Sequence, residues 1–136
     1  MYGNPNAGIG RAAKVSKEAM VGLAVALDRF MAHDHARDFA EHRTQAELIA
    51  HELADFPNAE CEVIADPERH PMPVAVVRPV GGAWSGVAIR ETLAAGDPGV
   101  FVNLDQGGIS IHTHCLRDGD AEQIATRLRT LLRTMV

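Results

Sequence analysis

The chain has 136 residues, a length that fits one domain, and its 46% hydrophobic and 23% charged content is that of an ordinary soluble globular domain. Its net charge of −5 argues against broad nucleic-acid binding, which needs a basic surface, but allows a local basic pocket. No apolar run is long enough to span a membrane, and the N-terminus lacks a secretory signal. Because only two cysteines are present, we expect no disulfide framework and a cytoplasmic location.

The N-terminal half of the chain predicts a loop and then helices. Residues 1–15 are rich in Gly, Asn and Pro and lack periodicity, as in an extended loop. Ser16 is a suitable N-cap, and the apolar residues behind it recur every three or four positions, which is typical of an amphipathic helix. These residues are Met20, Leu23, Ala24, Leu27, Phe30 and Met31. Helical spacing resumes at Phe39 and closes at Pro57, so the polar segment 32–38 either bends one very long helix or separates two.

The period then changes to that of strands. The runs 61–66 and 72–80 are β-like and bounded by prolines, and apolar residues on both faces of the second run indicate a central strand. Ser85 can cap a short helix over residues 86–95, which Gly96 ends.

Two further strands are predicted at 99–105 and 108–115, with the hairpin turn DQGG (105–108) between them. Asp120 and Gln123 stand three residues apart and predict a capping box at the start of the last helix. That helix carries a single apolar stripe, formed by Ala121, Ile124, Ala125, Leu128, Leu131, Leu132 and Met135.

The order of these elements predicts an α+β fold. A mainly antiparallel sheet of about four strands, with helices packed on one face and a long N-terminal helix ahead of it, is the simplest way to bury the apolar stripes. We expect residues 1–15 to be a linker loop and residues 16–136 to form a single small α+β domain.

The loop before the first helix has the ingredients of an anion site. Gly8 and Gly10 permit close approach of the backbone, Arg11 and Lys14 bring two positive charges, and Ser16 opens a helix with unpaired N–H groups. A plain connector with solvated cations explains the same residues, and the pattern alone leaves both interpretations open. The Walker spacing and a preceding strand are absent, so a nucleotide P-loop is excluded.

The segment NPNAGIGRAAKVSKEAMVGLAVALDRF (4–30) carries a family resemblance. It resembles the selenocysteine-synthase-like branch of pyridoxal-phosphate-dependent enzymes of fold type I, and within it the D-glucosaminate-6-phosphate ammonia-lyase-like relatives. The most specific motif lies at 8–24, while ETLAAGDPGVFV and CLRDGDAEQIATRLRTLL extend the similarity over essentially the whole chain. Ala19 departs from the family, which usually has a second acidic residue there.

The resemblance implies that this chain corresponds to a C-terminal small domain. In the family the Schiff-base lysine lies upstream, in a large cofactor-binding domain, so neither Lys14 nor Lys17 is assigned that role and no catalytic residue is assigned. Carried over, Gly8, Gly10, Arg11 and Lys14 would shape a site for an anionic substrate or the cofactor phosphate in the whole enzyme. Residues 1–15 would be the linker from the missing large domain.

The function implied is that of a pyridoxal-phosphate-dependent lyase or transferase acting on an amino-acid or amino-sugar substrate. Pyridoxal 5'-phosphate is expected in the whole enzyme and not on this chain alone, which would be catalytically incomplete. The expected partners are a large cofactor-binding domain or subunit and further copies of the chain, with no membrane or nucleic acid. The alternative is a non-catalytic assembly module that pairs with a separate large subunit or self-associates.

Two histidine clusters contain possible metal ligands. His112 and His114 are predicted on one face of a strand beside Cys115, but only Asp105 suggests a third zinc ligand, so a polar sheet face is favoured. A second cluster is interpreted as a solvated helix face: His33, His35, Asp38 and His42. No metal residue is therefore assigned.

Three remaining side chains are given structural roles. Cys61 and Cys115 both fall in predicted strands without CxxC spacing, so buried thiols are expected. Trp84 is expected to pack in the core.

Overall fold

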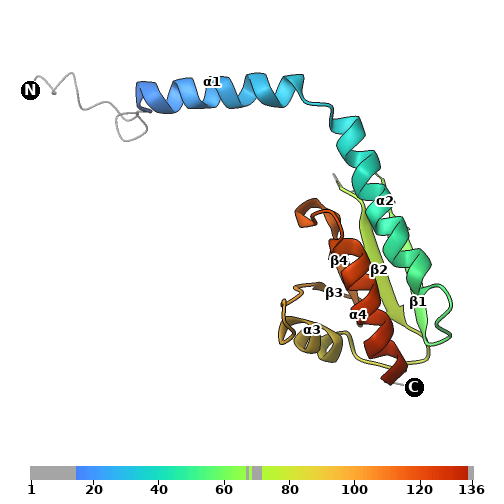
Figure 1. Ribbon diagram of the computed structural model, residues 1–136. Coiled ribbons are helices and arrows are strands. Elements are labelled where there is room, and N and C mark those ends of the chain that lie inside the picture. The colour runs from blue at the N-terminus through green and yellow to red at the C-terminus, as the bar shows by residue number, and fades with distance from the viewer. Residues whose placement is uncertain (1–14, 67, 69–71, 135–136) are drawn as a thin grey trace, which may run out of the picture. The chain divides into compact units, whose positions relative to one another are not determined.

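The computed structural model describes residues 15–66, 68 and 72–134. They belong to two compact units, and the boundary between the units in the sequence falls between His35 and Ala36. None of the helices among the described residues is sufficiently long and apolar to cross a membrane. The helices are α1 (Lys17–Ala32), α2 (His35–Leu53), α3 (Gly86–Ala94) and α4 (Asp120–Thr134), and the strands are β1 (Ala59–Ile64), β2 (Val74–Pro79), β3 (Asn103–Asp105) and β4 (Gly108–His112) (Figure 1).

Helix α1 begins and ends with defined caps. The Ser16 hydroxyl accepts a hydrogen bond from Ala19 N–H at 3.2 Å, as an N-cap does. The Glu18 carboxylate accepts hydrogen bonds from its own backbone N–H and from the Ser16 hydroxyl. These hydrogen bonds hold the pKa of Glu18 below its usual value. At the other end His33 takes an extended backbone conformation and its N–H bonds Phe30 O. Two separate helices are thus found, so the polar segment interrupts the pattern rather than bending one helix.

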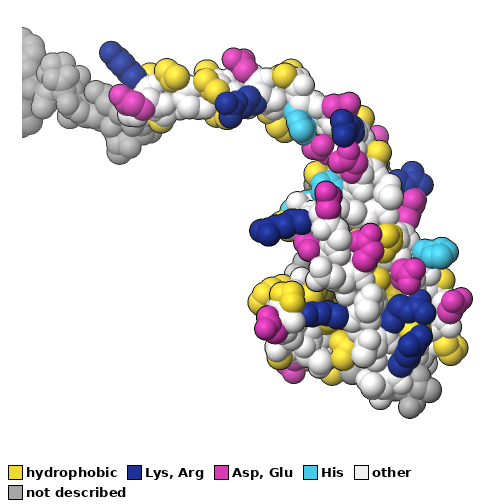
Figure 2. Space-filling model, in the orientation of Figure 1, with side chains coloured by type: hydrophobic (Ala, Val, Ile, Leu, Met, Phe, Trp, Pro, Cys, Tyr) yellow, Lys and Arg dark blue, Asp and Glu magenta, His cyan; other side chains and the backbone are white. Residues whose placement is uncertain are grey.

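The apolar stripe predicted for α1 is not buried by any described residue. None of the sixteen residues of α1 is buried, and Leu23 and Met31 are 71% and 75% exposed. Figure 2 shows hydrophobic side chains along this helix. The second unit differs, because each of its helices buries apolar residues.

The second unit is built on a four-stranded antiparallel sheet in the order β1-β2-β4-β3. Cys61 on β1 stands opposite Val77 on β2, which stands opposite Ile109 on β4, so alternate residues from this row form one face. Helices α2, α3 and α4 pack their apolar residues on that face, with α2 and α4 lying along the strands (Figure 1). The core consists of Ala46, Ile49, Leu53, Ala75, Val77, Trp84, Ile89, Leu93, Val102, Ile109, Ile111, Ala121, Ile124, Leu128 and Leu132. The predicted α+β fold, with helices on one face of the sheet, is confirmed.

Both C-terminal strands are shorter than predicted. The strand expected from residue 99 begins only at Asn103, because Val100 N–H bonds Leu93 O at the end of α3 instead of a neighbouring strand. The strand expected to reach residue 115 ends at His112. There the Thr113 hydroxyl bonds Pro73 O at 2.9 Å, and residues Thr113–Cys115 form a 3-10 turn.

The connection between these strands agrees with the prediction. Gln106 and Gly107 are the two loop residues of the hairpin, and their φ angles are 42° and 87°. A two-residue hairpin of the type I′ class requires positive φ at both positions.

The predicted side-chain caps of α3 and α4 are not formed. Ser85 occupies the N-cap position of α3, but its side chain makes no capping hydrogen bond. Gly86 N–H bonds Gly107 O, and a Cβ at Gly86 would collide with Gly108 O, so the helix starts in close contact with the hairpin. The Asp120 carboxylate accepts a hydrogen bond from Arg117 N–H at 2.9 Å and so fastens the loop before α4.

Candidate functional site

The four residues predicted to bind an anion lie outside the described residues. They are Gly8, Gly10, Arg11 and Lys14. The anion loop therefore stays a prediction, and the site below is built from other side chains.

The predicted pairing of two histidines on one strand face is wrong. His112 is the last residue of β4, whereas His114 lies in the 3-10 turn that follows. Their ring centroids are 6.0 Å apart and the rings are nearly perpendicular. Within the described part of the chain, no group of three potential metal ligands includes either histidine.

The cluster predicted on one solvated helix face is divided, because His33 is the C-cap of α1 and the other three residues belong to α2. His33 and His35 are exposed, and His35 Nε2 lies 2.8 Å from Phe30 O. His42 is half-buried on α2, where its Nδ1 lies 3.2 Å from Gln45 Oε1.

The two cysteines occupy different environments. Cys61 is half-buried on the core side of β1, and burial, together with the nearby Glu60 carboxylate, raises the pKa of its thiol to about 11. Cys115 is exposed in the 3-10 turn, so the prediction of a buried strand thiol is wrong for this residue. Trp84 is 7% exposed in the core, as predicted, and its Nε1–H donates to Asn58 O at 2.9 Å.

Sequence reasoning missed an ion-pair cluster on the side of the sheet opposite the core. Arg78 on β2 bonds Glu62 Oε2 on β1 at 2.8 Å and Asp105 Oδ2 on β3 at 2.9 Å. The hydrogen bond to Glu62, together with the contact to Asp105, raises the pKa of the arginine. Because both neighbouring carboxylates neutralise this guanidinium, it ties three strands together rather than offering a charge to a ligand.

A cavity of about 490 Å³ opens at one end of the sheet. Its walls come from the loop between α3 and β3, the end of β4, the 3-10 turn with the residues after it, and the first turn of α4. Two other hollows of the same unit measure about 230 Å³ each. The cavity of about 490 Å³ is lined by Pro98, Gly99, Val100, Phe101, Ile111, His112, Cys115, Leu116, Arg117, Asp120, Gln123 and Ile124.

Hydrogen bonds from α4 hold the walls of this cavity. Arg127 donates to Pro98 O and, at 2.6 Å, to Asp97 O, which fixes the loop after α3. The bond from Arg117 N–H to the Asp120 carboxylate fixes the opposite wall. The cavity is therefore preformed by contacts that do not need a ligand.

The lining combines an apolar surface with a few polar groups. Ile111 and Ile124 belong to the core side, and Phe101 stands at the rim with 85% of its surface exposed. Arg117 is exposed, and its guanidinium has no ion pair among the described residues. A ligand with an apolar or ring body and one carboxylate or phosphate group would fit these side chains, because an unpaired guanidinium binds such anions in a forked geometry.

The cavity offers no lysine for a covalent link to pyridoxal phosphate. That cofactor is held through a lysine, and the cavity lining contains none. Of the two lysines in the sequence, Lys17 lies on the first turn of α1 and Lys14 lies outside the described residues.

The second unit has the architecture of a small α+β domain, with a four-stranded antiparallel sheet covered by helices on one side. Comparison with known proteins gives a point of reference for the fold of the chain. No family model matches the sequence, and no curated protein matches it closely. A solved structure titled "Structure of D-Glucosaminate-6-phosphate Ammonia-lyase" matches with a TM-score of 0.63 and 22% sequence identity. The match covers 96% of this chain but 36% of that one, and at this identity it establishes a shared fold.

Proposed function

We propose that this chain is the C-terminal small domain of a pyridoxal-phosphate-dependent lyase or transferase that acts on an amino-acid or amino-sugar substrate. The observation that carries the proposal is the fold match, which includes 96% of this chain and only 36% of an ammonia-lyase chain. The resemblance of residues 4–30 to the same family supports it independently. Residues 1–15 are then the linker from a large domain, and the whole assembly is a cytoplasmic homo-oligomer.

The proposed contribution of this chain is to bind and orient the substrate. Arg117 pairs with an anionic group of the substrate, while Phe101 and the isoleucines of the cavity exclude water from its body. The loop residues Gly8, Gly10, Arg11 and Lys14 add a second anion contact. Pyridoxal phosphate, when bound by the large domain, supplies the electron sink for elimination chemistry.

Reconstitution tests this function. The chain, its large partner and their mixture are each incubated with pyridoxal phosphate and D-glucosaminate 6-phosphate, the substrate named for the structural neighbour. Ammonia release is expected only from the mixture, and Arg117→Met is expected to raise the KM of the mixture at least about tenfold, because a charged hydrogen bond is lost. Arg133→Met, an exposed arginine on α4 away from the cavity, is the matched control.

A direct cofactor test bears on the incompleteness of the chain. The chain alone is expected to show no absorbance band near the visible edge after incubation with pyridoxal phosphate and dialysis. A band that survives dialysis and disappears in Lys14→Ala would show a specific lysine site on this chain and contradict the proposal.

The alternative is a non-catalytic assembly module that pairs with a separate large subunit or self-associates. The exposed apolar residues of α1 favour it, since such a surface marks an interaction site. A mixture that forms a stable complex but releases no ammonia from any amino-acid or amino-sugar substrate would favour this alternative.

A further inference from the structure

Arg117 and Asp120 both line the cavity of about 490 Å³ and are held together by their backbones. Arg117 N–H bonds the Asp120 carboxylate at 2.9 Å, and Asp120 N–H bonds Arg117 O at 3.1 Å, so the two residues close a tight turn. Gly119 inside this turn has a φ of 86°, a conformation that favours glycine. The carboxylate of Asp120 is therefore fixed close to the residue whose guanidinium is offered to a ligand.

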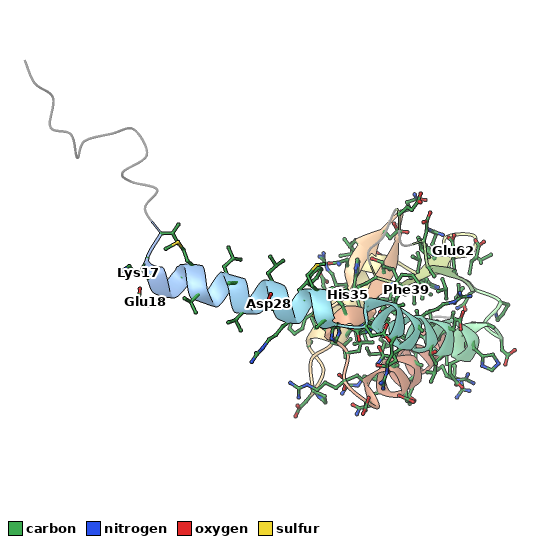
Figure 3. All side chains as sticks on the ribbon, turned by 90° about the horizontal axis from the view of Figure 1, so that it is seen from above. Lys17, Glu18, Asp28, His35, Phe39 and Glu62 are labelled. Carbon is green, nitrogen blue, oxygen red and sulfur yellow. The ribbon has the colours of Figure 1, made fainter. Side chains whose placement is uncertain are left out.

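A ligand meets one charge of each sign in this cavity. Among the described residues of the lining, Arg117 is the only arginine or lysine and Asp120 is the only carboxylate. Arg78 is the contrasting case, because its charge is used by Asp105 and by Glu62, which Figure 3 labels. The Asp120 carboxylate bonds the backbone of Arg117, so the guanidinium can still bind an anion while a negative charge stays nearby.

This pair of charges favours a monoanion over a dianion. The attraction of Arg117 for a second negative charge is offset by repulsion from Asp120. The cost of taking an ion out of water remains, and it rises with the square of the charge in the Born description. A carboxylate therefore loses less on entering a partly apolar cavity than a phosphate monoester, which carries about two charges at pH 8.

The start of α4 acts in the same direction. The N-terminal end of a helix attracts phosphate groups through its free N–H groups and its dipole. The first turn of α4 carries Asp120 and Glu122, whose charges oppose a phosphate at this helix end.

We propose that the cavity binds a monoanionic carboxylate through Arg117, and that Asp120 is the residue that discriminates against phosphate. The inference rests on the proposed function in taking this carboxylate to be that of the amino-acid or amino-sugar substrate. A phosphate group elsewhere on such a substrate is left to the predicted loop at 8–14, whose sequence GIGRAAK contains no acidic residue.

Cys115 supplies the readout for the first test. Its exposed thiol lines the cavity, so a bound ligand should slow its reaction with iodoacetamide, an uncharged reagent, followed by mass spectrometry. Three probes that share a benzyl group are compared at pH 8: phenylacetate, benzyl phosphate and benzyl alcohol. Phenylacetate should give half-maximal protection at a concentration at least about fivefold lower than benzyl phosphate, and benzyl alcohol should protect least. Equal protection by the two anions, stronger protection by benzyl phosphate, or no protection by phenylacetate at about 20 mM would overturn the proposal.

Asp120→Asn tests the discriminating charge itself. The asparagine oxygen can still accept the hydrogen bond from Arg117 N–H, so the negative charge is removed while the turn is kept. The half-protecting concentration of benzyl phosphate should fall at least about fivefold more than that of phenylacetate, because a dianion is relieved of twice the repulsion. Asp118→Asn, the same change at an exposed residue of the same turn outside the lining, is the matched control and should leave the ratio of the two concentrations unchanged. Equal shifts in both variants contradict the role of Asp120.

Both tests use this chain alone and measure no reaction, so they can fail separately from the proposed function. Selective protection by phenylacetate without ammonia release from the reconstituted mixture keeps the carboxylate site and contradicts the proposed function. Ammonia release together with equal protection by both anions keeps the proposed function and contradicts the carboxylate selectivity.

Discussion

Arg78 and Arg117 show how the same residue type takes opposite roles in this fold. Arg78 contacts carboxylates on two other strands and is neutralised, whereas Arg117 at the cavity has no ion pair among the described residues. The sequence contains eleven arginines, and nothing in the local pattern of either segment separates these two. Their difference arises from the register of β1, β2 and β3, which brings Glu62 and Asp105 to the same side chain.

Cys61 is expected to make the free energy of unfolding of the second unit vary with pH in the alkaline range. Its folded-state pKa of about 11 lies above the ordinary value of 9.0, since burial disfavours the thiolate. The contribution is fully present below pH 9 and is lost as the pH rises from about 9 to 11, because the unfolded thiol ionises first. Urea unfolding should therefore show a fall in stability over this range that Cys61→Ala reduces.

A thiol reagent provides the control for this prediction. At pH 8 the exposed Cys115 should react at least about tenfold faster than Cys61, since reaction requires an accessible thiolate. Equal rates for the two thiols in the folded chain would contradict the environment described for Cys61.

Elements with a strong, regular pattern were predicted well, and their ends were not. Helix α4 and strand β2 follow their apolar stripes, because these stripes face the core directly. Residues 99–102 alternate like a strand, yet the backbone of Val100 bonds α3, and this competing partner is set by tertiary packing. The cavity could not be predicted for the same reason, since its walls come from the loop after α3 and from the stretch between β4 and α4, which meet only through tertiary packing.

Arg127 is expected to control the loop between α3 and β3. It donates to Pro98 O and Asp97 O, so Arg127→Met leaves two loop carbonyls without their partner. We expect a loss of about 1–3 kcal/mol in the free energy of unfolding, measured by urea titration followed by circular dichroism. Arg133→Met changes the same residue type at an exposed position of α4 and should cost less than about 0.5 kcal/mol. Equal losses in both variants would show that the loop contacts contribute nothing.

At the scale of the whole molecule, the described residues fall into two compact units. The predicted division into a linker at 1–15 and one small domain at 16–136 stays a prediction. The amphipathic spacing of α1 was identified correctly, but spacing alone does not reveal whether the covering surface belongs to the same chain. The second unit carries the entire buried core, and no residue of α1 is buried.

Residues 36–136 are therefore expected to fold without the first unit. A chain that starts at Ala36 should unfold cooperatively, with a melting temperature within about 4 °C of the full chain, because no buried contact is removed. Differential scanning calorimetry on both chains measures this. A broad, non-cooperative transition in the shorter chain would show that the first unit supports the core.

Trp84 gives this protein a built-in optical probe. It is the sole tryptophan of the sequence, its indole lies in the core, and its N–H is bonded to Asn58 O. The emission spectrum of the native chain therefore reports on a single location, where the segment before α3 meets the start of β1. A red shift of that emission signals opening of this junction, and changes confined to α1 should leave the wavelength of the maximum unaltered.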